Sequence, residues 1–156
     1  MEKVDKAVQY FTEGFNCSQA VFTAIVENSG IEKESALKIA AGFGGGIARM
    51  QKTCGAVTGA VMALGYLNGN TSPSDDEKKE KVYEQVQVFV KHFTEKHGTI
   101  KCSELLGCSL QTAEDRQKAK ELKLFETVCR KCVADAVNIL EEITGDPGLP
   151  SSKEAS

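Results

Sequence analysis

The chain has no tryptophan, only two histidines and only three prolines among its 156 residues. It also lacks a long apolar run. Its most apolar uncharged stretch, residues 53–70, contains two asparagines and four glycines and falls short of the roughly 20 apolar residues that span a bilayer. We therefore interpret this stretch as a buried helix and expect no membrane insertion. With 19 basic against 22 acidic residues, the chain lacks the concentrated positive charge that nucleic acids require, so we expect no nucleic-acid partner.

Several signatures of catalysis and cofactor binding are also missing. His92 and His97 lie five residues apart, not the four that place a metal-binding pair on one helix face, and we expect both to be solvated surface residues. The glycine cluster at 42–46 has neither the spacing of a phosphate-binding loop nor a strand before it, so we interpret it as a flexible lead-in to Cys54. No C-x-x-C-H sequence occurs, which excludes covalent haem attachment.

Sulfur is the reactive group that the chain has in excess, with six cysteines. Residues 1–6 carry charges where a secretory signal would have its apolar stretch, so we expect a cytoplasmic protein. In a reducing cytosol, cysteines are seldom structural disulfides and are more often metal ligands, redox thiols or buried apolar residues. The chemistry of this chain is therefore expected to involve thiols.

Apolar residues recur at helical spacing along almost the whole chain, and no stretch shows sustained strand alternation. The pattern predicts an all-α, single-domain multi-helix bundle over residues 1–145, followed by a disordered tail over residues 146–156. The helix starts are predicted from capping residues: Asn16 with Gln19, Ser74 with Glu77, and Thr112 with Asp115. The last helical pattern runs to Thr144 with a break near Phe125.

Three cysteines are predicted in the first turn of a helix, where free backbone N–H groups and the helix dipole stabilise a thiolate. They are Cys17, Cys54 and Cys102, with Asn16, Thr53 and Thr99 as the respective caps. For each of them, the alternative is a buried thiol that packs as a small apolar residue. The repetition of one placement at three positions favours reactive thiols.

Cys129 and Cys132 form a C-x-x-C pair inside a helical pattern, without the strand that precedes such a pair in thioredoxin-like proteins. The spacing places both sulfurs on one helical face, and the intervening Arg130 and Lys131 favour thiolate. Because Cys132 is in phase with apolar positions such as Ala136, we interpret Cys132 as a core residue and Cys129 as the functional one.

Gly55 and Gly59 leave one face of the helix at 54–67 without side chains. A cofactor or another backbone can approach such a face closely. We predict these two glycines as cofactor-binding positions, with tight helix packing as the alternative.

The order of these motifs resembles the C-GCAxxG-C-C family of redox-active proteins. The resemblance covers residues 5–143 and rests on Asn16-Cys17, the glycine cluster at 42–46, residues 54–59 (CGAVTG), residues 102–107 (CSELLG) and Cys129. It implies redox activity without naming a substrate, and related domains carry an iron–sulfur cluster on cysteines. It also implies four signature cysteines, with Cys108 and Cys132 outside the signature: Cys17, Cys54, Cys102 and Cys129.

Three functions remain open on the sequence. In the first, the four signature cysteines converge, one low-pKa thiolate attacks a disulfide or oxidant, and a neighbouring thiol resolves the mixed disulfide. The partner would be a redox protein or a small thiol or oxidant. In the second, the same four thiolates bind a metal, most simply a [2Fe-2S] cluster. In the third, the chain is a helical interaction module without catalysis, in which the sulfurs are buried and scattered.

Overall fold

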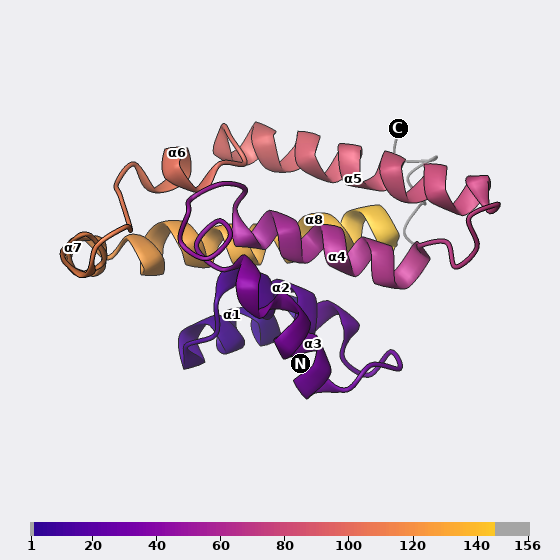
Figure 1. Cartoon of the computed structure of the whole chain (residues 1–156), viewed down its shortest axis with the longest axis horizontal. Helices are drawn as coiled ribbons and strands as arrows, with labels where there is room; N and C mark the ends of the chain where they lie inside the picture. The colour runs from indigo at the N-terminus through magenta and orange to yellow at the C-terminus, as the bar shows by residue number, and fades with distance from the viewer. Residues whose placement is uncertain (1, 146–156) are drawn as a thin grey trace.

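The computed structural model of the protein describes residues 2–145, and within them the predicted all-α fold is confirmed (Figure 1). The described part contains two isolated β-bridges but no β-strand. Its helices are α1 (Lys3–Glu13), α2 (Cys17–Val26), α3 (Lys33–Ala40), α4 (Gly55–Asn68), α5 (Asp76–His97), α6 (Cys102–Leu106), α7 (Ala113–Glu121) and α8 (Arg130–Thr144). The tail predicted at 146–156 lies outside the described residues. None of the described helices has both the length and the apolar character needed to cross a membrane.

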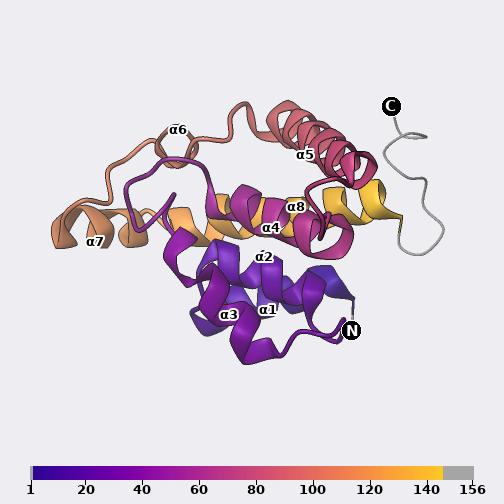
Figure 2. The same ribbon diagram turned by 45° about the vertical axis from the view of Figure 1, so that its right-hand side comes forward.

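The helices are arranged in three layers (Figures 1 and 2). Helices α4 and α8 form the middle layer, α5 covers them on one side, and α1, α2 and α3 lie on the other. At one end of the bundle, α6 and α7 extend beyond the other helices. This end holds the first residue of α6 and the junction between α7 and α8, two of the places where cysteines occur.

Helix α2 is at the centre of the core. Every residue from Ala20 to Val26 is buried, which fits a helix that is apolar around its whole circumference. Helix α8 instead buries one stripe that includes Val133, Val137 and Leu140. Because α2 packs against helices on several sides, its first residue, Cys17, is brought to the meeting point of the layers.

Two of the three predicted capping boxes are confirmed. In α2, the Asn16 side chain accepts from the Gln19 N–H at 2.9 Å, and in α7, Thr112 accepts from the Asp115 N–H at 3.0 Å. The box predicted with Ser74 is wrong, since Asp75 is the cap of α5 and accepts from the Lys78 N–H. A carboxylate competes well with a hydroxyl for the positive helix end.

The break expected near Phe125 is a π-helical segment, Phe125–Cys129, directly before α8. Such segments interrupt the regular α-helical hydrogen bonding and often occur at functional sites. Here the segment ends on Cys129, so the two cysteines of the C-x-x-C pair lie on either side of a change in helix geometry.

Gly59 allows α4 to pack closely on α2. A Cβ at this position would lie 2.8 Å from the carbonyl oxygen of Ser18, which is backbone and cannot move aside easily. We expect Gly59→Ala to lower the free energy of unfolding by about 1–3 kcal/mol through overpacking. Gly65→Ala, in the same helix with open space around it, is the control and should raise stability by about 0.5–1 kcal/mol. Denaturant unfolding measures both changes, and equal effects of the two substitutions would contradict the packing argument.

Candidate functional site

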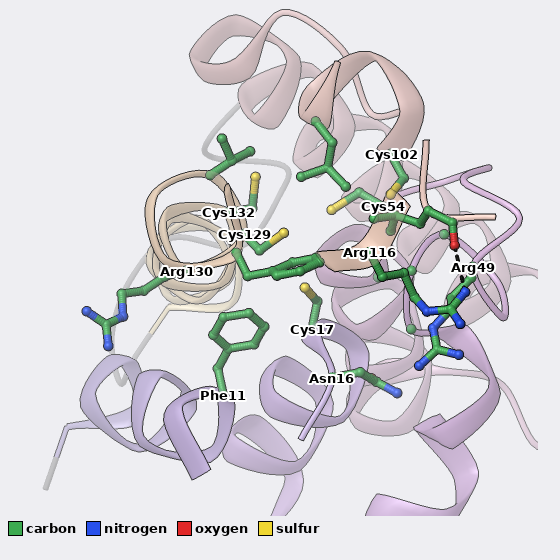
Figure 3. A pocket seen from close by; sticks show the side chains of 18 of the residues that line it. Phe11, Asn16, Cys17, Arg49, Cys54, Cys102, Arg116, Cys129, Arg130 and Cys132 are labelled. Atoms are coloured by element: carbon green, nitrogen blue, oxygen red, sulfur yellow. Dashed lines mark hydrogen bonds between the residues drawn. The ribbon is translucent and has the colours of Figure 1, made fainter. Parts of the chain in front are cut away.

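Five of the six cysteines line one pocket of about 1110 Å³, at the end of the bundle where α2, α4, α6 and α8 meet (Figure 3). They are Cys17, Cys54, Cys102, Cys129 and Cys132. The four cysteines predicted to converge therefore share a pocket, and Cys132 joins them. The scattered sulfurs that the interaction-module hypothesis requires are not found among these five.

Cys54 and Cys132 form the deeper thiol pair, with relative exposures of 6% and 1%. The pKa of Cys54 is lowered, and the largest cause is a hydrogen bond from the Cys132 thiol. The backbone N–H groups of Ala56 and Val57 also lower this pKa, whereas burial raises it. The same contact and burial raise the pKa of Cys132. Cys54 is thus the group of this pair that ionises first, with Cys132 as its proton-bearing neighbour.

The position of Cys54 differs from the one predicted. Helix α4 begins at Gly55, so Cys54 is the N-cap residue and not part of the first turn. Thr53 does not cap the helix but forms a β-bridge with Lys101. The Cys54 sulfur still interacts with the N–H groups of the first turn, which is the thiolate-stabilising contact expected at a helix N-terminus.

Cys17 and Cys129 form a second, shallower pair, in which both residues are half-buried. Cys17 is the first residue of α2, as predicted. The expectation that this position lowers its pKa is wrong, because a thiol–thiol hydrogen bond with Cys129 and burial raise the pKa well above the ordinary value. Burial and neighbouring sulfurs thus outweigh the helix dipole at Cys17.

Cys102 is the first residue of α6 and is buried, with a relative exposure of 7%. Its predicted cap is wrong by two residues: Lys101 is the N-cap, while the Thr99 hydroxyl accepts from the Lys101 N–H. Burial is the main cause that raises the pKa of Cys102 to about 12, with smaller contributions from Cys54 and Cys129. At neutral pH Cys102 is therefore a protonated thiol.

The two cysteines outside the signature differ from each other. Cys132 is buried, as expected for a core residue, but it also contacts Cys54 and His97. Cys108 is half-buried and is not among the residues that line the pocket. The division of the C-x-x-C pair into one functional and one packing residue missed the contact between Cys132 and Cys54, because that contact joins α8 to the start of α4.

His97 is not the solvated residue that the sequence predicted. Its side chain is 9% exposed, and its ring lies 4.6 Å from that of Phe93. Nδ1 is 3.9 Å from the Cys132 sulfur, and Nε2 is 2.9 Å from Oδ2 of Asp135 in a close electrostatic contact. Cys132 and Asp135 are three residues apart in α8 and so lie on the same face toward α5. A carboxylate that orients this histidine is thus supplied by another helix.

The backbone of other segments approaches Gly55 and Gly59 closely. This is the tight helix packing that is the alternative to cofactor binding at these two positions. A Cβ at Gly55 would lie 3.1 Å from both the Phe43 carbonyl oxygen and the Ser18 nitrogen. Gly55 also lines the pocket, whereas Gly59 does not. Their role as cofactor-binding residues stays a prediction.

The segment that follows the glycine cluster forms one edge of the pocket and is extensively hydrogen-bonded. Its backbone closes on itself through bonds such as Ala48 N–H to Gly42 O and Lys52 N–H to Gly46 O. Ile47, Ala48 and Arg49 have φ values of 67°, 48° and 65°, a left-handed conformation that is costly for residues with a Cβ. The flexible lead-in predicted here is instead a compact, strained coil, and strain of this kind clusters at functional sites.

The thiols do not fit a site for a single metal ion. Among residues 2–145, no three histidine, cysteine, aspartate or glutamate side chains are grouped as ligands of one ion. The hydrogen bonds between thiols join Cys54 with Cys132 and Cys17 with Cys129, while Cys17 also lies close enough to Cys54 and Cys132 for their charges to raise its pKa. We derive no step that passes through a metal.

The raised thiol pKa values predict lower stability at alkaline pH. The folded chain keeps protons on Cys17, Cys102 and Cys132 that the unfolded chain loses above the ordinary pKa of 9.0. Stability is therefore retained below about pH 9 and lost as the pH rises toward 12, by at most about 1.4 kcal/mol per pH unit for each such thiol. Denaturant unfolding under reducing conditions measures the slope. Cys102→Ser should make it shallower, and an unchanged slope would contradict this assignment.

The fold and the pocket define a helical protein with a cavity that is lined by thiols. A family model described as "Putative redox-active protein (C_GCAxxG_C_C)" matches residues 15–143, and the chain belongs to this family. A relative from Archaeoglobus fulgidus, described as "Uncharacterized protein", is 28% identical over 134 residues, which are 78% of this chain and 89% of the relative. No solved structure matches the chain.

Proposed function

We propose that the protein carries out thiol–disulfide exchange in the pocket, with Cys54 as the attacking thiolate and Cys132 as the resolving thiol. The observation that carries the proposal is the contact of Cys54 with the Cys132 thiol and with the N–H groups of Ala56 and Val57, which lowers the pKa of Cys54. An attacking thiolate needs such stabilisation, and a resolving thiol must lie next to it.

The reaction starts when the Cys54 thiolate attacks one sulfur of a substrate disulfide. A bond forms between Cys54 and that sulfur, the substrate S–S bond breaks, and the other half leaves as a thiolate that takes up a proton. Cys132 then transfers its proton to Nδ1 of His97 and attacks the Cys54 sulfur. The bond between Cys54 and the substrate sulfur breaks, and the second half of the substrate leaves as a thiolate that takes up a proton, so that a Cys54–Cys132 disulfide remains. The substrate is reduced by two electrons and the protein is oxidised by two.

His97 is placed to accept the proton of Cys132. Nε2 faces the Asp135 carboxylate, so Nδ1 is the nitrogen that remains available toward the sulfur. Among the described residues, the titratable groups that contact His97 are Cys132 and Asp135. While Cys54 is a thiolate, Cys132 donates to it. Once Cys54 is in a mixed disulfide, that acceptor is lost and the imidazole is the remaining base.

Disulfide mapping tests the proposal. Fully reduced protein is treated with one equivalent of diamide, alkylated and digested without reductant, and the linked peptides are identified by mass spectrometry. We expect a Cys54–Cys132 link, and a second link between Cys17 and Cys129 when oxidant is in excess. Formation of a different intramolecular pair at one equivalent, or of no intramolecular disulfide, would contradict the assignment.

The metal alternative predicts a different outcome in the same preparation. Four thiolates that hold a [2Fe-2S] cluster would be protected from alkylation, and anaerobically purified protein would contain about two irons per chain with visible absorbance. Thiol exchange instead predicts that all six cysteines are free thiols in the reduced protein. Iron content and thiol count therefore decide between the two functions.

A further inference from the structure

The pocket carries positive charge although the chain as a whole has a net charge of -3. Four of its lining residues are cationic, and one is a carboxylate, Glu126. The cations are Arg49, Arg116, Lys120 and Arg130. A cavity with one sign of charge concentrates ligands of the opposite sign and accelerates their arrival.

A second cavity of about 510 Å³ adjoins the pocket and shares Ala48, Arg49 and Arg116 with it. Lys52 is the third cation of this smaller cavity, and none of its lining residues is acidic. The two cavities thus form one continuous surface. The larger cavity contains the thiols, and the smaller cavity is lined by a cluster of three cations, Arg49, Lys52 and Arg116.

The cations of this cluster are not neutralised within the described chain. None of the ion pairs found in residues 2–145 involves Arg49, Lys52 or Arg116. Arg116 is oriented by its Nη1, which donates to the carbonyl oxygens of Leu110 and Gln111 at 3.0 and 3.3 Å. Arg49 and Arg116 both line both cavities, and Figure 3 shows their side chains extending toward the same edge of the pocket in that view.

The backbone at Arg49 supports the same conclusion. Arg49 ends the run of left-handed residues in the strained coil, at φ 65°, and its N–H donates to the Gly44 carbonyl oxygen. The coil therefore fixes the backbone of one cation that lines both cavities together with Arg116, and cations gathered around one cavity repel one another unless an anion binds there. Guanidinium groups bind phosphate and carboxylate oxygens in a bidentate manner.

We propose that the substrate is a small disulfide that carries two or more negative charges, with its sulfur at Cys54 and its anionic groups at Arg49, Lys52 and Arg116. This inference rests on the proposed function for the reaction at Cys54. A small molecule is favoured because Cys54 is buried inside the pocket, and the pocket volume of about 1110 Å³ is just above the range of roughly 300–1000 Å³ for small-molecule sites.

Single-turnover kinetics test the charge preference. Pre-reduced protein is mixed with coenzyme A disulfide, glutathione disulfide, the neutral 2-hydroxyethyl disulfide or the cationic cystamine, and the loss of protein thiols is followed. We expect at least one anionic disulfide to react roughly tenfold or more faster than the neutral one, an advantage that declines with salt. A faster reaction of coenzyme A disulfide indicates phosphate as the preferred anion, and a faster reaction of glutathione disulfide indicates carboxylate.

The variant Arg49→Gln/Arg116→Gln should lose this advantage, so that its rate with the anionic disulfide falls toward its own rate with the neutral one. Lys118→Gln is the control for charge, since Lys118 is an exposed residue of α7 that lines neither cavity. Circular dichroism checks that each variant keeps its helices. Equal rates for anionic and neutral disulfides in the native chain, or an advantage that survives the double substitution, would overturn the inference.

A binding measurement separates this inference from the proposed reaction. Desulfo-coenzyme A and S-methylglutathione carry the anionic groups but cannot exchange thiols, and isothermal titration calorimetry measures their binding. We expect binding of at least one that is weakened by Arg49→Gln/Arg116→Gln and not by Lys118→Gln. If no disulfide reacts, the exchange reaction fails, while such binding still supports the anion site. Absence of binding by both probes overturns the anion site.

Discussion

Replacing Cys54 by serine is expected to remove the fast-reacting thiol of the protein at neutral pH. Cys54 has a lowered pKa, whereas Cys17, Cys102 and Cys132 have raised values. Because the thiolate is the nucleophile, a thiol with a lowered pKa reacts at neutral pH faster, by about tenfold or more, than one with an ordinary or raised pKa. Iodoacetamide labelling between pH 5 and 10 measures the alkylation rate of each cysteine when it is read by mass spectrometry. The native chain should show a fast phase of alkylation at neutral pH, and Cys54→Ser should lack this fast phase.

Cys108→Ser is the matched control for this experiment. Cys108 is half-buried and does not line the pocket. Its backbone carbonyl oxygen accepts from Nε2 of Gln51 at 2.8 Å, and its side chain packs against the small apolar cluster that includes Leu106 and Leu110. The substitution should leave the fast phase in place. If Cys54 is alkylated with the pH dependence of an unperturbed thiol, or if Cys54→Ser retains the fast phase, Cys54 is not the attacking group.

The substitution should also change the neighbour of Cys54. The pKa of Cys132 is raised first by its contact with Cys54 and then by burial. A serine hydroxyl does not ionise in this range, so the part of the shift that comes from the Cys54 anion disappears. We therefore expect Cys132 to be alkylated at lower pH in Cys54→Ser than in the native chain, within the limits set by its burial. An unchanged profile would show that the two sulfurs do not interact.

The features predicted well from the sequence are those that depend on neighbours along the chain. The Asn16 and Thr112 capping boxes follow from two residues three positions apart, and the apolar periodicity that defines the helices is equally local. The start of α5 was missed by one residue because Ser74 and Asp75 are both good caps, and only the folded loop selects between them. There the Ser74 hydroxyl hydrogen-bonds to that of Ser72 instead.

The features that the sequence missed depend on contacts between distant segments. Nothing near Cys132 in the chain indicates that its sulfur meets Cys54, which is 78 positions away, since that contact requires α8 to pack beside the start of α4. In the same way, His97 and Asp135 are brought together by the packing of α5 on α8. The pKa of Cys17 was misjudged for the same reason: the helix dipole is local, whereas Cys129 and the burial that outweigh it are not.

A partial signal for the histidine was nevertheless present. His97 is four residues after Phe93 in the buried stripe of α5, and a position in that register faces the core. His92 falls outside this register, so helix phase does not place it in the core. A prediction based on helix phase, instead of on the spacing between the two histidines, would have identified His97 as the buried one and would have prompted a search for its partner.

His97→Gln is expected to slow the resolving step while the attack by Cys54 continues. Glutamine cannot accept the proton of Cys132, and loss of a general base typically costs about 10²–10⁴ in rate. The mixed disulfide between Cys54 and the substrate should therefore accumulate, visible by mass spectrometry after acid quenching. The alkylation rate of Cys54 should stay near its native value. Asp135→Asn should give a smaller effect in the same direction, because Asp135 acts through the orientation of the imidazole.

The other histidine of α5 provides the control. His92 is half-buried and does not line the pocket, so His92→Gln should resolve the mixed disulfide at the native rate. The pH profile of the resolving rate separates proton transfer from a packing role: we expect the profile of His97→Gln to differ from that of the native chain, and the profile of His92→Gln to match it. If His97→Gln keeps the native pH profile or resolves as fast as His92→Gln, Cys132 transfers its proton elsewhere, and the contact between Nδ1 and sulfur serves only to pack α5 on α8.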